Sequence, residues 1–155
     1  MHPKLRSALE SIDFLERFES LREQFGELSF PYFTADPNTV KQKIEDLGFE
    51  TRYFRGERFF KIWMPGRKDQ EIVLAVDKAE AAFTFRLRID DKPVTSAYTS
   101  SALELSSDER NAARQYPHAR PDFKSYEDLD IILKAGLGMF AEVVKILDEM
   151  PSAEN

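Results

Sequence analysis

The sequence predicts a single α+β domain of two layers, in which an antiparallel sheet packs against helices from both ends of the chain. Apolar residues recur at steps of three and four within the first 25 residues and again beyond residue 125, which is the period of amphipathic helices. Between residues 50 and 99 the period changes to two, as in half-buried strands. Short turns separate these strands, so consecutive strands are expected to pair antiparallel as a meander.

The size and composition of the chain fit one soluble domain. Its 155 residues can bury a core of their own, which we expect over residues 1–150, with a frayed tail at residues 151–155. Apolar residues make up 42% and charged residues 32% of the chain. No apolar run reaches the roughly 18 residues that span a bilayer, and the N-terminus lacks the apolar core of a secretory signal. With no cysteine, disulfides are excluded, and we expect a cytoplasmic protein that does not bind membranes.

The first third of the chain carries two helix patterns. Apolar side chains at residues 3–25 line one face of a helix that Gly26 ends. Asp36 then provides an N-cap and Pro37 a first helical position for a second helix. Gly48 is typical of the residue that follows a helix C-terminus.

Five strands are expected in the meander. The first two flank a turn at Arg55-Gly56-Glu57, and Pro65-Gly66 ends the second. The fourth alternates most clearly, which predicts phenylalanines toward the core and Arg86 and Arg88 on the other face. The expected strands are residues 50–55, 58–64, 71–76, 83–89 and 94–99.

Two further helices are expected after the sheet. Ser106 and Glu109 form a capping-box pattern for a helix at residues 107–115. Residues 116–124 contain two prolines and are expected to form a loop.

The last helix begins at another capping pattern, that of Ser125 and Asp128. Gly136 and Gly138 weaken its middle, which indicates a kink or a close helix crossing. Its apolar stripe consists of Leu129, Ile132, Leu133, Met139, Phe140, Val143 and Leu147.

Residues 51–68 invert the charge of the chain. The whole chain has a net charge of −6 at pH 7, whereas this segment holds six basic residues against the single acid Glu57. Five aromatic residues are interleaved with the cations. If the register of the sheet places the cations of this segment on the same outer face as Arg86 and Arg88 of the fourth strand, that face is a basic binding surface. Its candidate residues are Arg52, Arg55, Arg58, Lys61, Trp63, Arg86 and Arg88.

The C-terminal helix has the opposite charge. Residues 126–155 hold seven acids and two lysines. An acidic helix surface would speed association with a basic partner. Its candidate binding residues are Glu127, Asp128, Asp130, Glu142, Asp148 and Glu149.

The sequence contains no catalytic, metal or cofactor motif on which an enzyme could be predicted. His118 is a candidate general acid or base that Asp122 or Tyr116 could orient, yet no nucleophile accompanies it. Asp90 and Asp91 are adjacent and lack a third ligand nearby, so turn formation explains them better than metal binding. We therefore predict a protein that is not an enzyme and needs no cofactor or metal.

The leading functional hypothesis is a small acidic protein-binding module, specifically a bacterial inhibitor or immunity-type protein that neutralises a basic partner. Trp, Tyr, Phe and Arg are enriched at binding hot spots, which favours another protein as the partner. The isoelectric point near 5.1 makes nucleic acid less favoured without excluding it. The alternatives are a secretion-chaperone-like protein, an anion or nucleic-acid binder that uses the basic sheet face, and an enzyme that uses His118. A purely structural role for the interleaved aromatic and basic residues, as core and solvated faces, competes with all of these.

Overall fold

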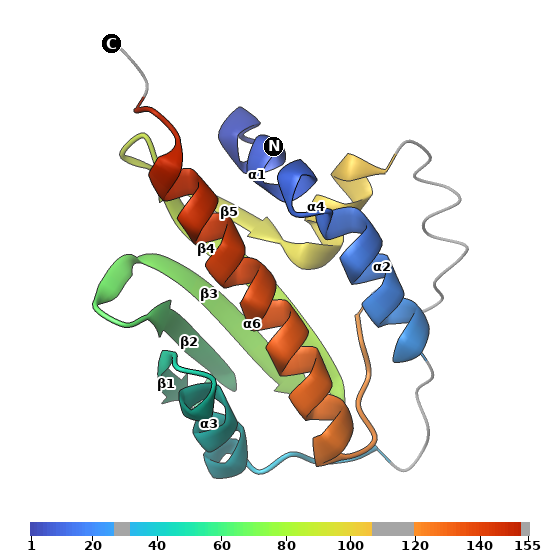
Figure 1. The fold of residues 1–155 in the computed structure, drawn as a ribbon. Coiled ribbons are helices and arrows are strands. Elements are labelled where there is room, and N and C mark those ends of the chain that lie inside the picture. The colour runs from blue at the N-terminus through green and yellow to red at the C-terminus, as the bar shows by residue number, and fades with distance from the viewer. Residues whose placement is uncertain (27–31, 107–119, 153–155) are drawn as a thin grey trace.

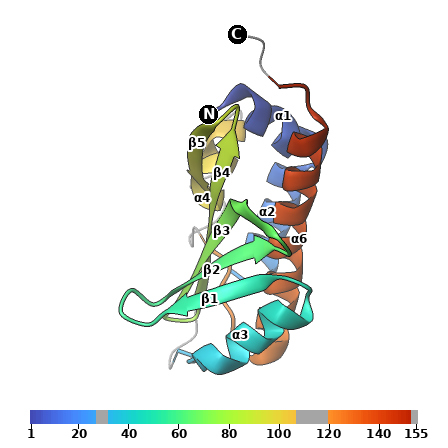
Figure 2. The same cartoon turned by 90° about the vertical axis from the view of Figure 1, so that its left-hand side faces the viewer.

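The computed structural model describes residues 1–26, 32–106 and 120–152. It confirms the α+β architecture: one antiparallel sheet of five strands in the order β1-β2-β3-β4-β5, with helices from both ends of the chain. Figure 1 shows the C-terminal helix lying diagonally across the sheet, with the N-terminal helices beside it. Figure 2 shows that these helices lie on the same side of the sheet.

The sheet is the expected meander with shifted boundaries. Each strand pairs antiparallel with the next. The third strand begins earlier than expected, because Met64 and Arg67 already pair across the tight turn at Pro65-Gly66. The strands are β1 (Glu50–Phe54), β2 (Phe59–Met64), β3 (Arg67–Asp77), β4 (Glu80–Ile89) and β5 (Lys92–Ala97).

The described helices are α1 (Pro3–Ser11), α2 (Phe14–Gln24), α3 (Pro37–Asp46), α4 (Tyr98–Leu105) and α6 (Tyr126–Glu149). Helix α4 was not expected from the sequence, which predicted that the last strand continues to residue 99. The strand ends at Ala97 because the residues that follow form a helix. Its buried residues are Tyr98, Ser101 and Ala102, and the spacing of three and four positions places them on one helix face. None of the described helices combines the length and apolar character needed to cross a membrane.

The single helix predicted over residues 3–25 is wrong, because the chain breaks into α1 and α2. Asp13 adopts a left-handed conformation, with φ 55° and ψ 42°. At about 100° per residue, the buried face of α1 around Leu9 and that of α2 around Phe18 would point in nearly opposite directions in a continuous helix. The break at Asp13 turns both faces toward the same core.

The predicted helix ends are confirmed where the structure describes them. The Asp36 carboxylate accepts a hydrogen bond from the backbone N–H of Asn38, and Ser125 accepts one from that of Asp128. Gly48 has a φ of +93°, which only glycine adopts without strain. The helix predicted at residues 107–115 and most of the loop predicted after it lie outside the described residues.

Gly136 brings α6 into direct contact with the sheet. A Cβ atom at this position would lie 2.3 Å from Cζ of Phe83 in β4. The Tyr98 hydroxyl donates a 2.7 Å hydrogen bond to the Gly136 carbonyl, and its ring stacks on Phe83. Burial raises the pKa of this tyrosine. Helix α6 continues through Gly136 and Gly138, and the close contact at Gly136 is made with Phe83 of β4 and with Tyr98 at the start of α4.

Alanine at position 136 should destabilise the protein. The added methyl group would be forced into the buried ring of Phe83, and overpacking of this kind costs about 1–3 kcal/mol. Gly138→Ala is the matched control, because nothing lies within 4 Å of a Cβ there. It should gain up to about 1 kcal/mol from helix propensity. Urea unfolding followed by circular dichroism measures both changes, and equal effects of the two substitutions would contradict the packing described.

Candidate binding surface on the outer face of the sheet

The sheet has an inner face that carries the core and an outer face that points away from it. Figure 2 shows α3 and α6 on the inner side of β1–β3 and no described helix opposite them. Residues that pair across strands share a face, so the outer face follows from the register of the sheet. Buried side chains that define the inner face are Phe60, Ile62, Ile72, Leu74, Phe83 and Phe85.

Cations and aromatic rings meet on the outer face of β1 and β2. Arg52 pairs with Lys61 in register, and Phe54 pairs with Phe59. The two phenylalanine rings stack with centroids 5.1 Å apart. The Arg52 guanidinium and the Lys61 ammonium each lie 5.1 Å from the centroid of Phe54. Exposed contacts of this kind contribute only about 0.5–1 kcal/mol each, so the cations can move to a partner at small cost.

Trp63 extends this arrangement toward β3. The ammonium group of Lys68 lies 5.2 Å from the centroid of its ring. Its indole N–H donates a 3.1 Å hydrogen bond to Glu71, whose other carboxylate oxygen lies 3.5 Å from Arg86. This hydrogen bond orients the indole, and one face of the ring lies under the Lys68 ammonium. We call the set Arg52, Phe54, Phe59, Lys61, Trp63 and Lys68 the cation–aromatic cluster.

A shallow pocket of about 470 Å³ opens within the cation–aromatic cluster. Besides cluster residues it is lined by Glu50 and Thr51. Glu50 accepts a 3.2 Å hydrogen bond from the backbone N–H of Gly66, and Thr51 donates one to the backbone carbonyl of Lys61. The pocket thus combines three cations, two rings and one acid on strands held in fixed register. This arrangement can bind a ligand that brings both negative charge and apolar surface.

The structure brings only some of the predicted basic-face residues into this pocket. Arg52, Lys61 and Trp63 line it. Arg86 is linked to Trp63 through Glu71. Arg88 lies on the outer side of β4 but donates to the backbone carbonyl of Asp91 at 3.2 Å, away from the cluster.

The remaining predicted cations, Arg55 and Arg58, are exposed in the turn between β1 and β2. Figure 2 shows residues 55–58 projecting away from the helices. Phe54, Phe59 and Lys68 belong to the cluster although the sequence analysis did not select them as candidate binding residues. A register shift between Trp63 and Met64 interrupts the alternation, so strand period alone could not place Lys68 beside Trp63.

Three acids of the predicted acidic helix surface form ion pairs with cations of neighbouring elements. Asp130 binds Lys43 of α3, and Glu142 binds Arg17 of α2, each with a nitrogen–oxygen distance of 2.7 Å. Asp148 is bound to β3 as described next. These acids join α6 to its neighbours, and a basic partner would have to compete with those cations.

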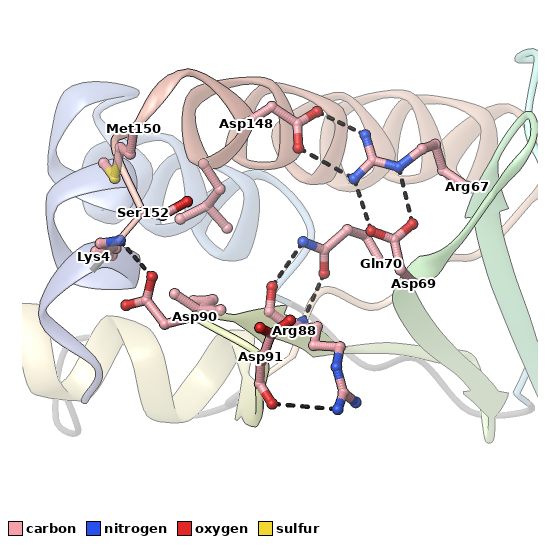
Figure 3. Close-up of a pocket in the computed structure, with 12 residues that line it drawn as sticks. Lys4, Arg67, Asp69, Gln70, Arg88, Asp90, Asp91, Asp148, Met150 and Ser152 are labelled. Carbon is pink, nitrogen blue, oxygen red and sulfur yellow. Dashed lines mark hydrogen bonds and ion pairs between the residues drawn. The ribbon is translucent and has the colours of Figure 1, made fainter. Parts of the chain in front are cut away.

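Arg67 is held between two carboxylates at the C-terminal end of α6 (Figure 3). Its guanidinium donates to Asp148 at 2.7 and 3.1 Å and to Asp69 at 2.9 Å twice. These hydrogen bonds raise the pKa of Arg67 and lower that of Asp69. The pairs line a polar pocket of about 390 Å³, at whose far side Lys4 binds Asp90 at 2.6 Å. Each of these acids has a cation partner, so the ion pairs around the pocket connect α6 to β3 and α1 to the turn after β4.

Asp90 and Asp91 form the two-residue turn between β4 and β5, as the sequence predicted. Both have positive φ, 52° and 62°, which aspartate tolerates better than most residues. Among the described residues, no group of three or more His, Cys, Asp or Glu side chains could hold a metal ion.

The residues of the acid–base hypothesis are only partly described. His118 and Tyr116 lie outside the described residues. Asp122 is buried, and its backbone N–H donates to the carbonyl of Phe25 at 2.7 Å. A catalytic role for His118 stays a prediction.

Comparison with protein-family models, with curated proteins and with solved structures finds no match to this chain.

Replacing Arg67 by lysine should test the electrostatic link between β3 and α6. The change keeps the charge but loses the fork that binds both carboxylates. Because these groups are partly exposed, we expect a loss of about 1 kcal/mol or less at pH 7. Arg6→Lys, at the exposed pair with Glu10 within α1, is the control and should change stability less.

The effect of Arg67→Lys should depend on pH. The folded-state pKa of Asp69 is lowered from 3.8, so its contribution to stability is complete above the unfolded value. It is lost as the pH falls through the folded value. The difference in unfolding free energy between wild type and variant should therefore shrink between pH 7 and about pH 3. Urea unfolding at both pH values measures it, and a difference that grows at low pH would contradict the link.

Proposed function

We propose that this protein is a binding module for another protein and that it binds through the outer face of β1–β3. The observation that carries the proposal is the cation–aromatic cluster on a sheet face that no described helix covers. Partly exposed aromatic rings beside an arginine are typical of binding hot spots, where aromatic residues and arginine are enriched.

The cluster is suited to binding because its parts are already ordered. The phenylalanine pair is stacked, and the tryptophan is hydrogen bonded to Glu71. Side chains that are fixed before binding lose less conformational entropy when a partner arrives. The cations above the rings are held by weak contacts, so they can reorient toward acidic groups of a partner.

The ion pairs of α6 favour the sheet face over the acidic helix as the primary surface. In the inhibitor or immunity-type form of the hypothesis, the acids of α6 would bind a basic partner. Three of them are already bound to Lys43, Arg17 and Arg67. That form, and the secretion-chaperone form, remain alternatives within the same class of protein-binding modules.

Charge reversal at Arg52 and Lys61 should abolish partner binding. The double variant Arg52→Glu/Lys61→Glu would be compared with wild type as bait in extracts of the native host cells, followed by mass spectrometry. Lys134→Glu/Lys145→Glu is the matched control: both lysines are exposed on α6, make no ion pair with other described residues, and give the same change in net charge. We expect a protein captured by wild type and control and lost from the sheet variant.

A further variant, Glu127→Lys/Glu149→Lys, separates the two surfaces. Both acids are exposed on α6 and make no ion pair with other described residues. Retention of the partner by the sheet variant, together with its loss from this acid variant, would contradict the proposal and move the binding surface to the helix.

A further inference from the structure

We infer that the cation–aromatic cluster recognises an extended acidic segment of the partner in which one carboxylate lies between two apolar side chains. This inference rests on the proposed function and specifies the chemistry of the partner. It follows from the order in which charges and rings are arranged across the strands.

The outer face of β1–β3 is striped. One row across the strands is aromatic, formed by Phe54 opposite Phe59, and the next is cationic, formed by Arg52 opposite Lys61. The third row has Trp63 at its centre. Neighbouring rows are two residues apart along a strand, which is about 7 Å.

An extended peptide has the same spacing between its alternate side chains. Laid along β2, it would place an apolar side chain on the phenylalanine pair, an acid on the cationic row, and a second apolar side chain on the indole. A carboxylate at the middle position would reach the guanidinium of Arg52 and the ammonium of Lys61 together, and charge-assisted hydrogen bonds of this kind are strong. The pocket of about 470 Å³ lies over these rows.

Two acids on the same face favour a peptide over a nucleic-acid strand. Glu50 and Glu71 are the register partners of Trp63 on either side. A nucleic-acid strand carries a phosphate at every nucleotide and would bring negative charge against these carboxylates. The proposed peptide segment instead presents an apolar side chain beside them. The net charge of −6 on the whole chain opposes a polyanion further. Glu71 also occupies the only donor of the indole, so the ring can offer a ligand only apolar contact once the Lys68 ammonium moves off its face.

The single tryptophan makes this inference directly measurable. Trp63 is the only tryptophan in the chain, so its fluorescence reports on the pocket without a label. The probe is the capped peptide Thr-Phe-Thr-Glu-Thr-Phe-Thr, which contains no tryptophan. Its controls are the same peptide with lysine in place of glutamate, the same peptide with serine in place of both phenylalanines, and a ten-nucleotide oligothymidine.

We expect a saturable change in Trp63 fluorescence with the glutamate peptide below about 1 mM and binding at least tenfold weaker for both control peptides. Arg52→Gln/Lys61→Gln should weaken binding at least tenfold, while Lys134→Gln/Lys145→Gln, away from the face, should not change it. Equal affinity for the three peptides, no saturable change, or tighter binding of the oligothymidine would each overturn the inference.

The two experiments fail separately. If a partner is captured through the sheet face but the glutamate peptide does not saturate the tryptophan signal, the acidic segment is wrong and the proposed function stands. If the captured partner is indifferent to Arg52→Glu/Lys61→Glu, the proposed function is wrong whatever the peptide does.

Discussion

The contact between Gly136 of α6 and the ring of Phe83 in β4 sets the distance between the two layers of this protein. Because the helix has no side chain at that point, its backbone lies directly on the sheet, and Tyr98 closes the contact with a hydrogen bond to the Gly136 carbonyl. The apolar side chains of α1, α2 and α6 then fill one continuous core on the inner face. Because the core lies on the inner face, the side chains on the outer face of β1–β3 contact one another instead, through ring stacking and cation–ring contacts.

Charge is arranged differently on the two sides of the sheet. On the helical side, acids of α6 are paired with cations from α2, α3 and β3, so that charge contributes to joining elements distant in sequence. On the outer side, three cations lie over aromatic rings. Rings do not neutralise charge as carboxylates do, and those cations keep most of their ability to attract an anion. This difference is why the sheet face, and not the acidic helix, is the stronger candidate for recognition.

Local patterns in the sequence were sufficient to predict the sheet, both ends of α3 and the start of α6. The strand period, the turn at Pro65-Gly66 and the caps at Asp36 and Ser125 are each determined by neighbouring residues. The break at Asp13 was missed because steps of three and four can be traced through Ile12 and Leu15, while the buried set changes phase by about half a turn. Reading the phase as well as the period would have revealed it.

The candidate site was predicted in part for the same reason. Alternation within the second strand places Lys61 and Trp63 on one face, whereas Arg52 joins them only through the register of β1 with β2, which the sequence analysis had to assume. Lys68 was missed since the register shift after Trp63 cannot be read from period. The pairing of Arg67 with Asp148 joins residues 81 positions apart, and no local pattern carries that information.

Trp63 lies on a sheet face open to solvent, under the ammonium group of Lys68 and in a pocket lined by three cations and one acid. Quenching of its fluorescence by iodide, caesium and neutral acrylamide tests this on the protein alone. Local positive charge concentrates anions and repels cations, so iodide should quench more strongly than caesium, and the preference should fall as ionic strength rises. Acrylamide should quench efficiently as well. A tryptophan protected from all three quenchers, or one that caesium quenches as well as iodide does, would contradict the account.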